Sequence, residues 1–155
     1  MKRMLFFLMI SGVLASCHKD DFGIELAEQD YLIFGEFYGE CVGENCVSIF
    51  KLTAEELFED VLHDYTKQNF DFVELSEDKF EQVKDLVDFF PNQLLNEEKT
   101  ILGCPDCADT GGLFIQYSKD GDVKSWSMDK LKMGAPSYLY DFIDKVNEKI
   151  ALIND

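Results

Sequence analysis

The chain has 155 residues, of which 31 are acidic and 14 basic, and its formal net charge is −17 at pH 7. This charge excludes nucleic acid and anionic lipid as electrostatic partners, because both are bound through clustered Lys and Arg. The composition, 46% hydrophobic and 14% aromatic with three prolines, is that of a folded chain and not of a disordered one.

The first sixteen residues have the layout of a secretory signal peptide. A basic start, Lys2 and Arg3, precedes an apolar run over residues 4–14, which is followed by two small residues. The run is too short for a transmembrane helix, and this order is the one that export requires. We therefore expect residues 1–16 to be removed, which leaves 31 acidic against 12 basic residues, a formal charge of −19.

The end of this segment, Leu14-Ala15-Ser16-Cys17, resembles the lipobox of bacterial lipoproteins. The resemblance implies cleavage before Cys17, a diacylglycerol thioether on its sulfur and acylation of the new amino group. Two or three acyl chains anchor a protein stably, whereas a single chain binds a membrane only marginally. We therefore expect the protein to attach to the membrane through its acyl chains and not through electrostatic attraction.

The charged residues after the cysteine, Lys19, Asp20 and Asp21, resemble the export signal of surface lipoproteins of the Bacteroidota. The resemblance implies a position in the outer leaflet of the outer membrane, facing the medium. The alternative is a solvated tether that carries no export signal, since short charged motifs recur by chance. We expect residues 17–30 to form the lipidated tether and residues 31–155 a single domain.

Strand patterns dominate the first half and the centre of the domain. Residues 31–38 and 47–52 are rich in aromatic and β-branched side chains and predict two strands joined by a cysteine-containing loop. Residues 70–75 predict a short strand. The strongest hairpin signal joins residues 113–118 to 123–128 across the turn dipeptide Asp120-Gly121.

Helical periodicity marks residues 76–90 and 136–153, where apolar side chains recur at i, i+3 and i+4. Residues 53–65 are ambiguous: a Thr53-to-Glu56 capping box favours a helix, and a return strand after an acidic turn is the alternative. Two amphipathic helices and several hairpins predict an α+β fold, in which an antiparallel sheet of hairpins has two amphipathic helices packed on one face.

Four cysteines remain besides the lipidated one, in the close pairs Cys41/Cys46 and Cys104/Cys107. Export favours two structural disulfides within these pairs, although crossed pairings are open from sequence. A Cys₄ zinc site is the second interpretation, because two short-spaced pairs suit a tetrahedral ion. The third is a redox dithiol at Cys104 and Cys107, which the neighbouring acids disfavour because they raise a thiol pKa.

Three other patterns are candidate sites. The tripeptide Asp109-Thr110-Gly111 matches that of aspartic proteases, but a turn is favoured because no second copy of it occurs. Acids around His63 would share a helix face and hold a cation if residues 53–65 were helical, and a solvated face is favoured. Trp126 is expected to pack on the sheet, with stacking on a sugar as the alternative.

The cysteine loops, Phe37-Tyr38-Gly39-Glu40-Cys41 and Gly103-Cys104-Pro105-Asp106-Cys107, resemble uncharacterised secreted proteins of the same bacterial group, which implies no activity. We expect a surface-anchored, non-enzymatic binding or accessory lipoprotein without a cofactor, whose ligand is an unidentified protein or small molecule. The alternative is an envelope metal-binding or thiol-redox protein that uses the two cysteine pairs.

Overall fold

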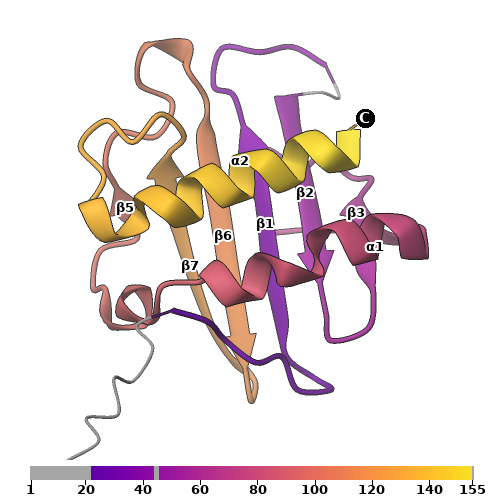
Figure 1. Cartoon of the computed structure of the whole chain (residues 1–155). Helices are drawn as coiled ribbons and strands as arrows, with labels where there is room; N and C mark the ends of the chain where they lie inside the picture. Colours follow the sequence, from indigo (N-terminus) through magenta and orange to yellow (C-terminus); the bar gives the residue numbers. More distant parts are fainter. Residues whose placement is uncertain (1–21, 44–45, 155) are drawn as a thin grey trace, which may run out of the picture.

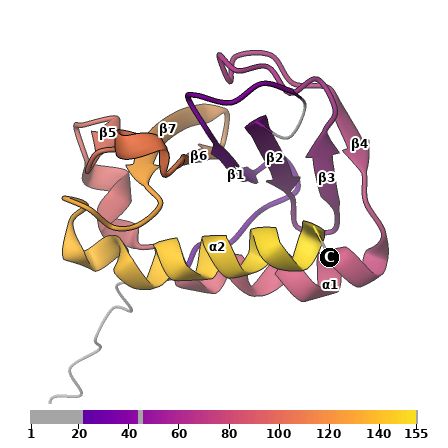
Figure 2. The same cartoon turned by 90° about the horizontal axis from the view of Figure 1, so that it is seen from above.

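The structure is a computed structural model that describes residues 22–43 and 46–154. A seven-stranded sheet carries its helices on one face, which confirms the predicted α+β class (Figure 1, Figure 2). The strands are β1 Tyr31–Phe37, β2 Val47–Leu52, β3 Leu57–Asp60, β4 Phe72–Glu74, β5 Ile101–Leu102, β6 Gly112–Lys119 and β7 Asp122–Asp129. The α-helices are α1 Glu77–Val83 and α2 Tyr140–Asn154, and the 3₁₀ segments are η2 Lys84–Phe89, η3 Asn92–Asn96, η4 Cys107–Asp109 and η5 Ser137–Leu139.

The strand order is β4-β3-β2-β1-β6-β7-β5, with β1 at the centre. Neighbouring strands are antiparallel except β5 and β7, which are parallel. Phe34 of β1 pairs with Phe50 on one side and Ile115 on the other. Because both faces of this central strand are covered, side chains that point to either face are buried, and apolar residues are favoured at every position. This explains the apolar start of β1.

The main core lies between the sheet and the helices. Alternate residues of β1, Leu32 and Phe34, face this layer and are fully buried. Phe90, at the end of η2, is buried there with its ring centroid 5.4 Å from those of Tyr117 and Phe142. The apolar stripe of α2 is buried in the same layer, and so are Val83 of α1 and Leu86 of η2. Both predicted helical segments are therefore core elements, although the first is α-helical only over α1 and continues as the 3₁₀ segment η2.

The opposite face of the sheet carries a smaller apolar cluster that a loop covers. Ile33, Phe37 and Phe114 belong to this cluster. Phe70, from the loop between β3 and β4, stacks on Phe72 with ring centroids 5.3 Å apart and lies 6.4 Å from Phe114. The helices and this loop therefore lie on opposite sides of the sheet (Figure 2).

The helix favoured for residues 53–65 is wrong, because strand β3 occupies part of this stretch. Thr53 and Glu56 close a tight turn: the Thr53 amide donates to the Glu56 carbonyl at 2.9 Å, and the Glu56 amide donates to Thr53 Oγ1 at 3.0 Å. A Thr hydroxyl that accepts an amide three residues on serves a turn as well as a helix N-cap. Residues 57–60 form a strand because they pair with β2 on one side and with β4 on the other.

The segment from Phe22 to Asp30, assigned to the tether from sequence, packs along the domain. The Gly23 amide donates to the Phe90 carbonyl at 2.8 Å, and the Ile24 amide donates to the Val87 carbonyl at 3.0 Å. Ile24 also packs against the main core. Burial of the apolar residues within this acidic segment favours its attachment to the fold, so residues 22–30 belong to the folded domain.

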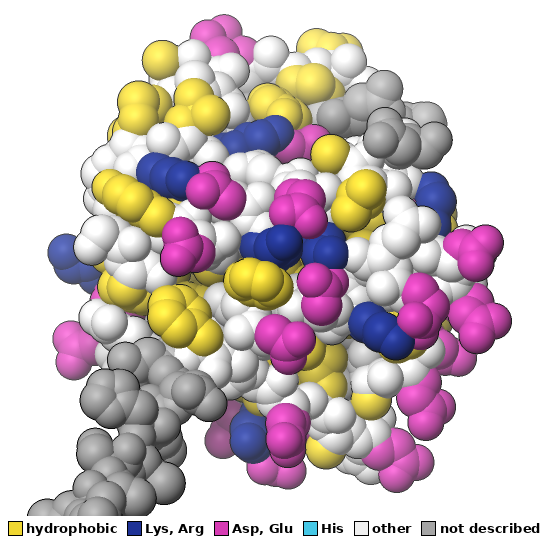
Figure 3. Space-filling model, viewed as in Figure 1, with side chains coloured by type: hydrophobic (Ala, Val, Ile, Leu, Met, Phe, Trp, Pro, Cys, Tyr) yellow, Lys and Arg dark blue, Asp and Glu magenta, His cyan; other side chains and the backbone are white. Residues whose placement is uncertain are grey.

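The helix-covered face carries lysines and carboxylates side by side (Figure 3). Lys149 pairs with Asp85 at 2.6 Å, and Lys132 pairs with Asp144 at 2.5 Å. Such pairs neutralise the few basic side chains locally within an acidic protein. Among the helices of the described residues, none combines the length and apolar character that crossing a membrane needs.

Candidate functional site

Both local cysteine pairs are disulfide-bonded, as the favoured interpretation predicted. Cys41 is bonded to Cys46 between β1 and β2, and Cys104 is bonded to Cys107 between β5 and β6, each with a Cα–Cα distance of 5.5 Å. The loops leave the same end of the sheet, because Phe37 at the end of β1 pairs with Gly112 at the start of β6. We call this end, formed by residues 38–43, 46 and 103–111, the disulfide end.

Asp106 joins the two cysteine loops. Its carboxylate accepts hydrogen bonds from the Gly39 amide at 2.6 Å and from the Gly111 amide at 3.1 Å. Asp106 adopts a left-handed conformation with φ of 62°, which Asp tolerates better than most residues. The bond between Cys104 and Cys107 closes the loop around Asp106, so that this carboxylate is held facing the β1–β2 loop.

Lys67, from the loop that covers the second sheet face, lies close to this end. Its Nζ lies 3.6 Å from the centroid of the Phe37 ring, a cation–π contact. Burial lowers the pKa of Lys67, and the negative charge of Asp106 opposes that shift. The ammonium group is therefore held by an aromatic ring and a nearby acid, under the disulfide end.

Lys130 contacts two side chains at the end of β1, Glu36 in the strand and Tyr38 just after it. Its Nζ donates to the Glu36 carboxylate and, at 2.6 Å, to the Tyr38 hydroxyl. Tyr38 also donates to Glu36 at 3.1 Å. Burial by itself lowers the pKa of Lys130, but the bonds to Glu36 and Tyr38 outweigh burial and raise that pKa above its ordinary value. The lysine thus stays charged and ties β1 to the end of β7.

A shallow groove runs across the sheet face that the helices leave uncovered. It has a volume of about 340 Å³ and lies between the loop of Lys67 and strands β5, β6 and β7. Polar side chains predominate in its lining: Thr66, Lys67, Gln68, Thr100, Gln116, Ser125 and Ser127. Hydroxyl and amide groups both donate and accept hydrogen bonds, so the groove is suited to contact polar ligands.

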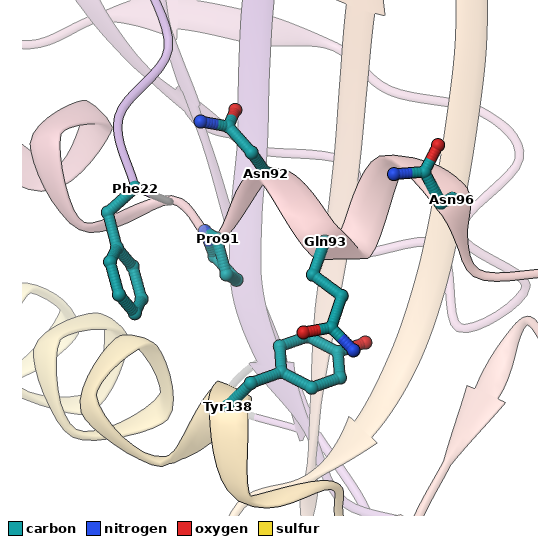
Figure 4. Close-up of a pocket in the computed structure, with 6 residues that line it drawn as sticks. All are labelled: Phe22, Pro91, Asn92, Gln93, Asn96 and Tyr138. Atoms are coloured by element: carbon teal, nitrogen blue, oxygen red, sulfur yellow. The ribbon is translucent and has the colours of Figure 1, made fainter. Parts of the chain in front are cut away.

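A second concavity, of about 430 Å³, lies beside the entry of the chain into the fold (Figure 4). Its walls come from η3, from η5 and from Phe22, which forms an isolated β-bridge with Pro91. The lining consists of Phe22, Pro91, Asn92, Gln93, Asn96 and Tyr138. Sequence reasoning missed this pocket, although three carboxamides within five residues of an otherwise acidic chain were a signal for it.

The acids around His63 accept hydrogen bonds that hold a loop together. Buried Asp60 accepts from the amides of Leu62, His63 and Asp71, and His63 Nδ1 lies 2.9 Å from the Val47 carbonyl oxygen. Hydrogen bonds from Thr66 and Asn69 lower the pKa of Asp64. Within residues 22–43 and 46–154, no three His, Cys, Asp or Glu side chains converge as metal ligands.

The other two candidates also have structural roles. Trp126 is 2% exposed and packs in the main core near Phe90, so the expected packing role is confirmed and its indole is not available to stack on a sugar. Asp109-Thr110-Gly111 forms a turn in which Asp109 has a left-handed backbone and the Thr110 hydroxyl donates to the Cys107 carbonyl at 2.9 Å. The turn was the favoured interpretation.

The fold and its loops define a two-layer α+β protein whose two disulfides lie at one end of the sheet. No protein-family model matches the chain, and no curated protein matches it. Cys17 and the predicted export residues Lys19, Asp20 and Asp21 lie outside the described residues.

Proposed function

We propose that the chain is an acylated lipoprotein of the outer membrane that displays its disulfide end to the medium as a non-enzymatic binding protein. One observation carries the proposal: the segment that precedes β1, residues 22–30 and indigo in Figure 1, lies along the opposite end of the strands from the cysteine loops. Asp30, which precedes β1, accepts a hydrogen bond from the Asp120 amide in the turn that joins β6 and β7, at the other end of the strands.

The distance between the proposed anchor and the fold supports this orientation. Cys17 and Phe22 are five residues apart, so the chain between them spans at most roughly 18 Å at about 3.5 Å per residue. A lipid on Cys17 would thus keep the side of the fold near Phe22 close to the bilayer. The strands run away from that side, and β1 alone, with seven residues, adds about 24 Å.

The contacts at the disulfide end support binding in preference to catalysis. Within it, Asp106 accepts hydrogen bonds from two backbone amides, and next to it Lys130 is paired with Glu36, so these charges hold the scaffold. A rigid end next to a polar groove presents a preformed surface, which lowers the entropy lost when a ligand binds. The expected ligand is a protein or a small molecule of the medium.

Acylation is tested by growing expressing cells with an alkynyl fatty acid and detecting the labelled chain. We expect labelling of the wild type and complete loss in Cys17→Ser, while Ser16→Ala, which keeps a small residue before the cysteine, remains labelled. Equal labelling of wild type and Cys17→Ser contradicts the anchor.

Surface display is tested separately by protease treatment of intact cells. We expect cleavage of the wild type and protection of a variant in which Lys19, Asp20 and Asp21 are all Ala, with both chains equally labelled by the fatty acid. If the labelled wild type is never cleaved, display is wrong although the anchor stands.

A further inference from the structure

We propose that the pocket between Phe22, η3 and η5 binds a neutral saccharide. This inference goes beyond the proposed role of the disulfide end, because the pocket lies beside the segment that precedes β1 and is a second, separate site. The pocket volume of about 430 Å³ lies in the range of small-molecule sites, roughly 300–1,000 Å³. Three segments far apart in the sequence build it, so it exists only in the folded chain.

The described residues that line the pocket are uncharged, although the protein is strongly acidic. None of these six residues carries a charge, whereas the whole chain has 31 acids and 14 bases. Gln93 and Asn96 present carboxamides, each of which donates and accepts hydrogen bonds. A sugar hydroxyl also donates and accepts, so a ring with adjacent hydroxyls matches such groups without requiring a charge on either side.

The hydroxyl of Tyr138 is buried and makes no hydrogen bond of good geometry with the described residues. Burial raises the pKa of Tyr138, and interaction with the Glu97 carboxylate as an acceptor raises it further, so the phenol keeps its proton. A ligand hydroxyl in the pocket would compete with Glu97 for this donor and could complete its hydrogen bonding.

The apolar walls suit the C–H face of a sugar ring. Phe22 is 43% exposed, and Pro91 lies next to it through the β-bridge. Figure 4 shows the Gln93 side chain extending toward the Tyr138 ring, with Phe22 on the other side of Pro91. Polar groups and ring surfaces thus line the same space, as in sites where a few polar groups orient a ligand against apolar walls.

The test is an NMR titration of residues 18–155, a soluble form that retains every described residue. The probes are methyl glucoside, methyl galactoside and methyl mannoside, with glucuronate as the charged counterpart and triglycine amide as a peptide. We expect saturable shifts of the Gln93 and Asn96 side-chain amide signals with at least one glycoside, and weaker binding of glucuronate. Because this form has no lipid anchor, its failure leaves the anchoring proposal unaffected.

Variants locate the binding. Gln93→Ala, Asn96→Ala and Tyr138→Phe are each expected to weaken glycoside binding roughly three- to tenfold, the loss of one neutral hydrogen bond. Gln82→Ala, which removes an exposed carboxamide of α1 outside both concavities, is the matched control and should bind like wild type. Unchanged Trp126 fluorescence establishes that each variant is folded, since this Trp is buried in the core.

A glycoside in solution and the head group of a membrane glycolipid present the same sugar, and a vesicle arm separates them. Cosedimentation with phosphatidylcholine vesicles that contain glucosyl diacylglycerol, but not with plain vesicles, identifies the lipid source; glycoside binding without cosedimentation identifies a free sugar. No saturable shift with any glycoside up to about 50 mM, or stronger binding of triglycine amide, overturns the proposal.

Discussion

The Asp106 carboxylate accepts a hydrogen bond from the Gly39 amide at 2.6 Å and so joins two disulfide loops 67 residues apart in sequence. The same carboxylate accepts from the Gly111 amide in its own loop. A charged acceptor shared by two loops gives the disulfide end a single arrangement, which neither disulfide achieves alone because each closes only its own loop.

Asp106→Asn should lower stability by about 1 kcal/mol, because an amide can replace only one of the two accepted bonds well. Asn is chosen since it tolerates the left-handed backbone at this position. The matched control is Asp109→Asn, in the same loop and also left-handed, whose change in urea unfolding should stay within about 0.5 kcal/mol. Equal losses in the two variants would show that the bond to Gly39 is unimportant.

Two glycines of the first strand region should differ sharply in their tolerance of alanine. At Gly35 a Cβ would overlap the Ser48 carbonyl oxygen and approach Ile49 Cα to 2.8 Å, so paired backbone must move. At Gly39 a Cβ would meet the Asp106 carboxylate, the end of a side chain that can rotate away. We expect losses of roughly 3 kcal/mol or more for Gly35→Ala and about 1 kcal/mol for Gly39→Ala.

Both variants are compared by urea unfolding followed through Trp126 fluorescence. Gly39→Ala combined with Asp106→Asn should cost little more than either alone, because both act on the same hydrogen bond. A reversed order of the two glycine variants would contradict the strand packing described here.

Asp30 should make stability depend on acid pH. Hydrogen bonds from the Asp120 and Ala27 amides hold the pKa of Asp30 below its usual value of about 3.8. A carboxylate with a lowered folded pKa contributes stability that is present above the unfolded pKa and is lost as the pH falls through the folded one. The segment before β1 therefore loses this attachment in acid.

Asp30→Asn removes this titration. Its urea midpoint should fall less than that of wild type between about pH 5 and pH 2, although it starts lower at neutral pH. Asp109→Asn again serves as the control and should follow the wild-type profile. Parallel profiles for wild type and Asp30→Asn would rule out the assigned role of Asp30.

Intact mass of residues 18–155 made in an oxidising compartment distinguishes disulfides from the zinc and thiol alternatives. We expect four hydrogens fewer than the reduced mass and no alkylation before reduction. A zinc adduct lost on denaturation, with four reactive thiols, would support the metal alternative; labelling of Cys104 and Cys107 alone would support the redox one. Each tight loop should contribute about 2 kcal/mol or less, so reduction weakens the fold without necessarily unfolding it.

Much of the fold follows from local patterns. The hairpin around Asp120-Gly121, the helix after Ser76 and the C-terminal helix are where alternation, capping and 3.6-residue periodicity predict them. Residues 53–65 were predicted wrongly because a capping motif also closes turns, and the two-residue strand β5 was missed because it carries no period. The secondary structure of such segments is determined by the strands with which they pair, which are distant in the sequence.

The sequence by itself determined the class of the fold, the disulfide pairs expected from close spacing, and the expectation of a lipid anchor at Cys17. Only the tertiary structure decided that Asp106 reaches Gly39, that Lys67 lies on Phe37, and that Phe22, Gln93 and Tyr138 share a pocket. Local patterns arise from interactions between near neighbours in the chain, whereas these contacts join segments that only the packing of the sheet, helices and loops brings together.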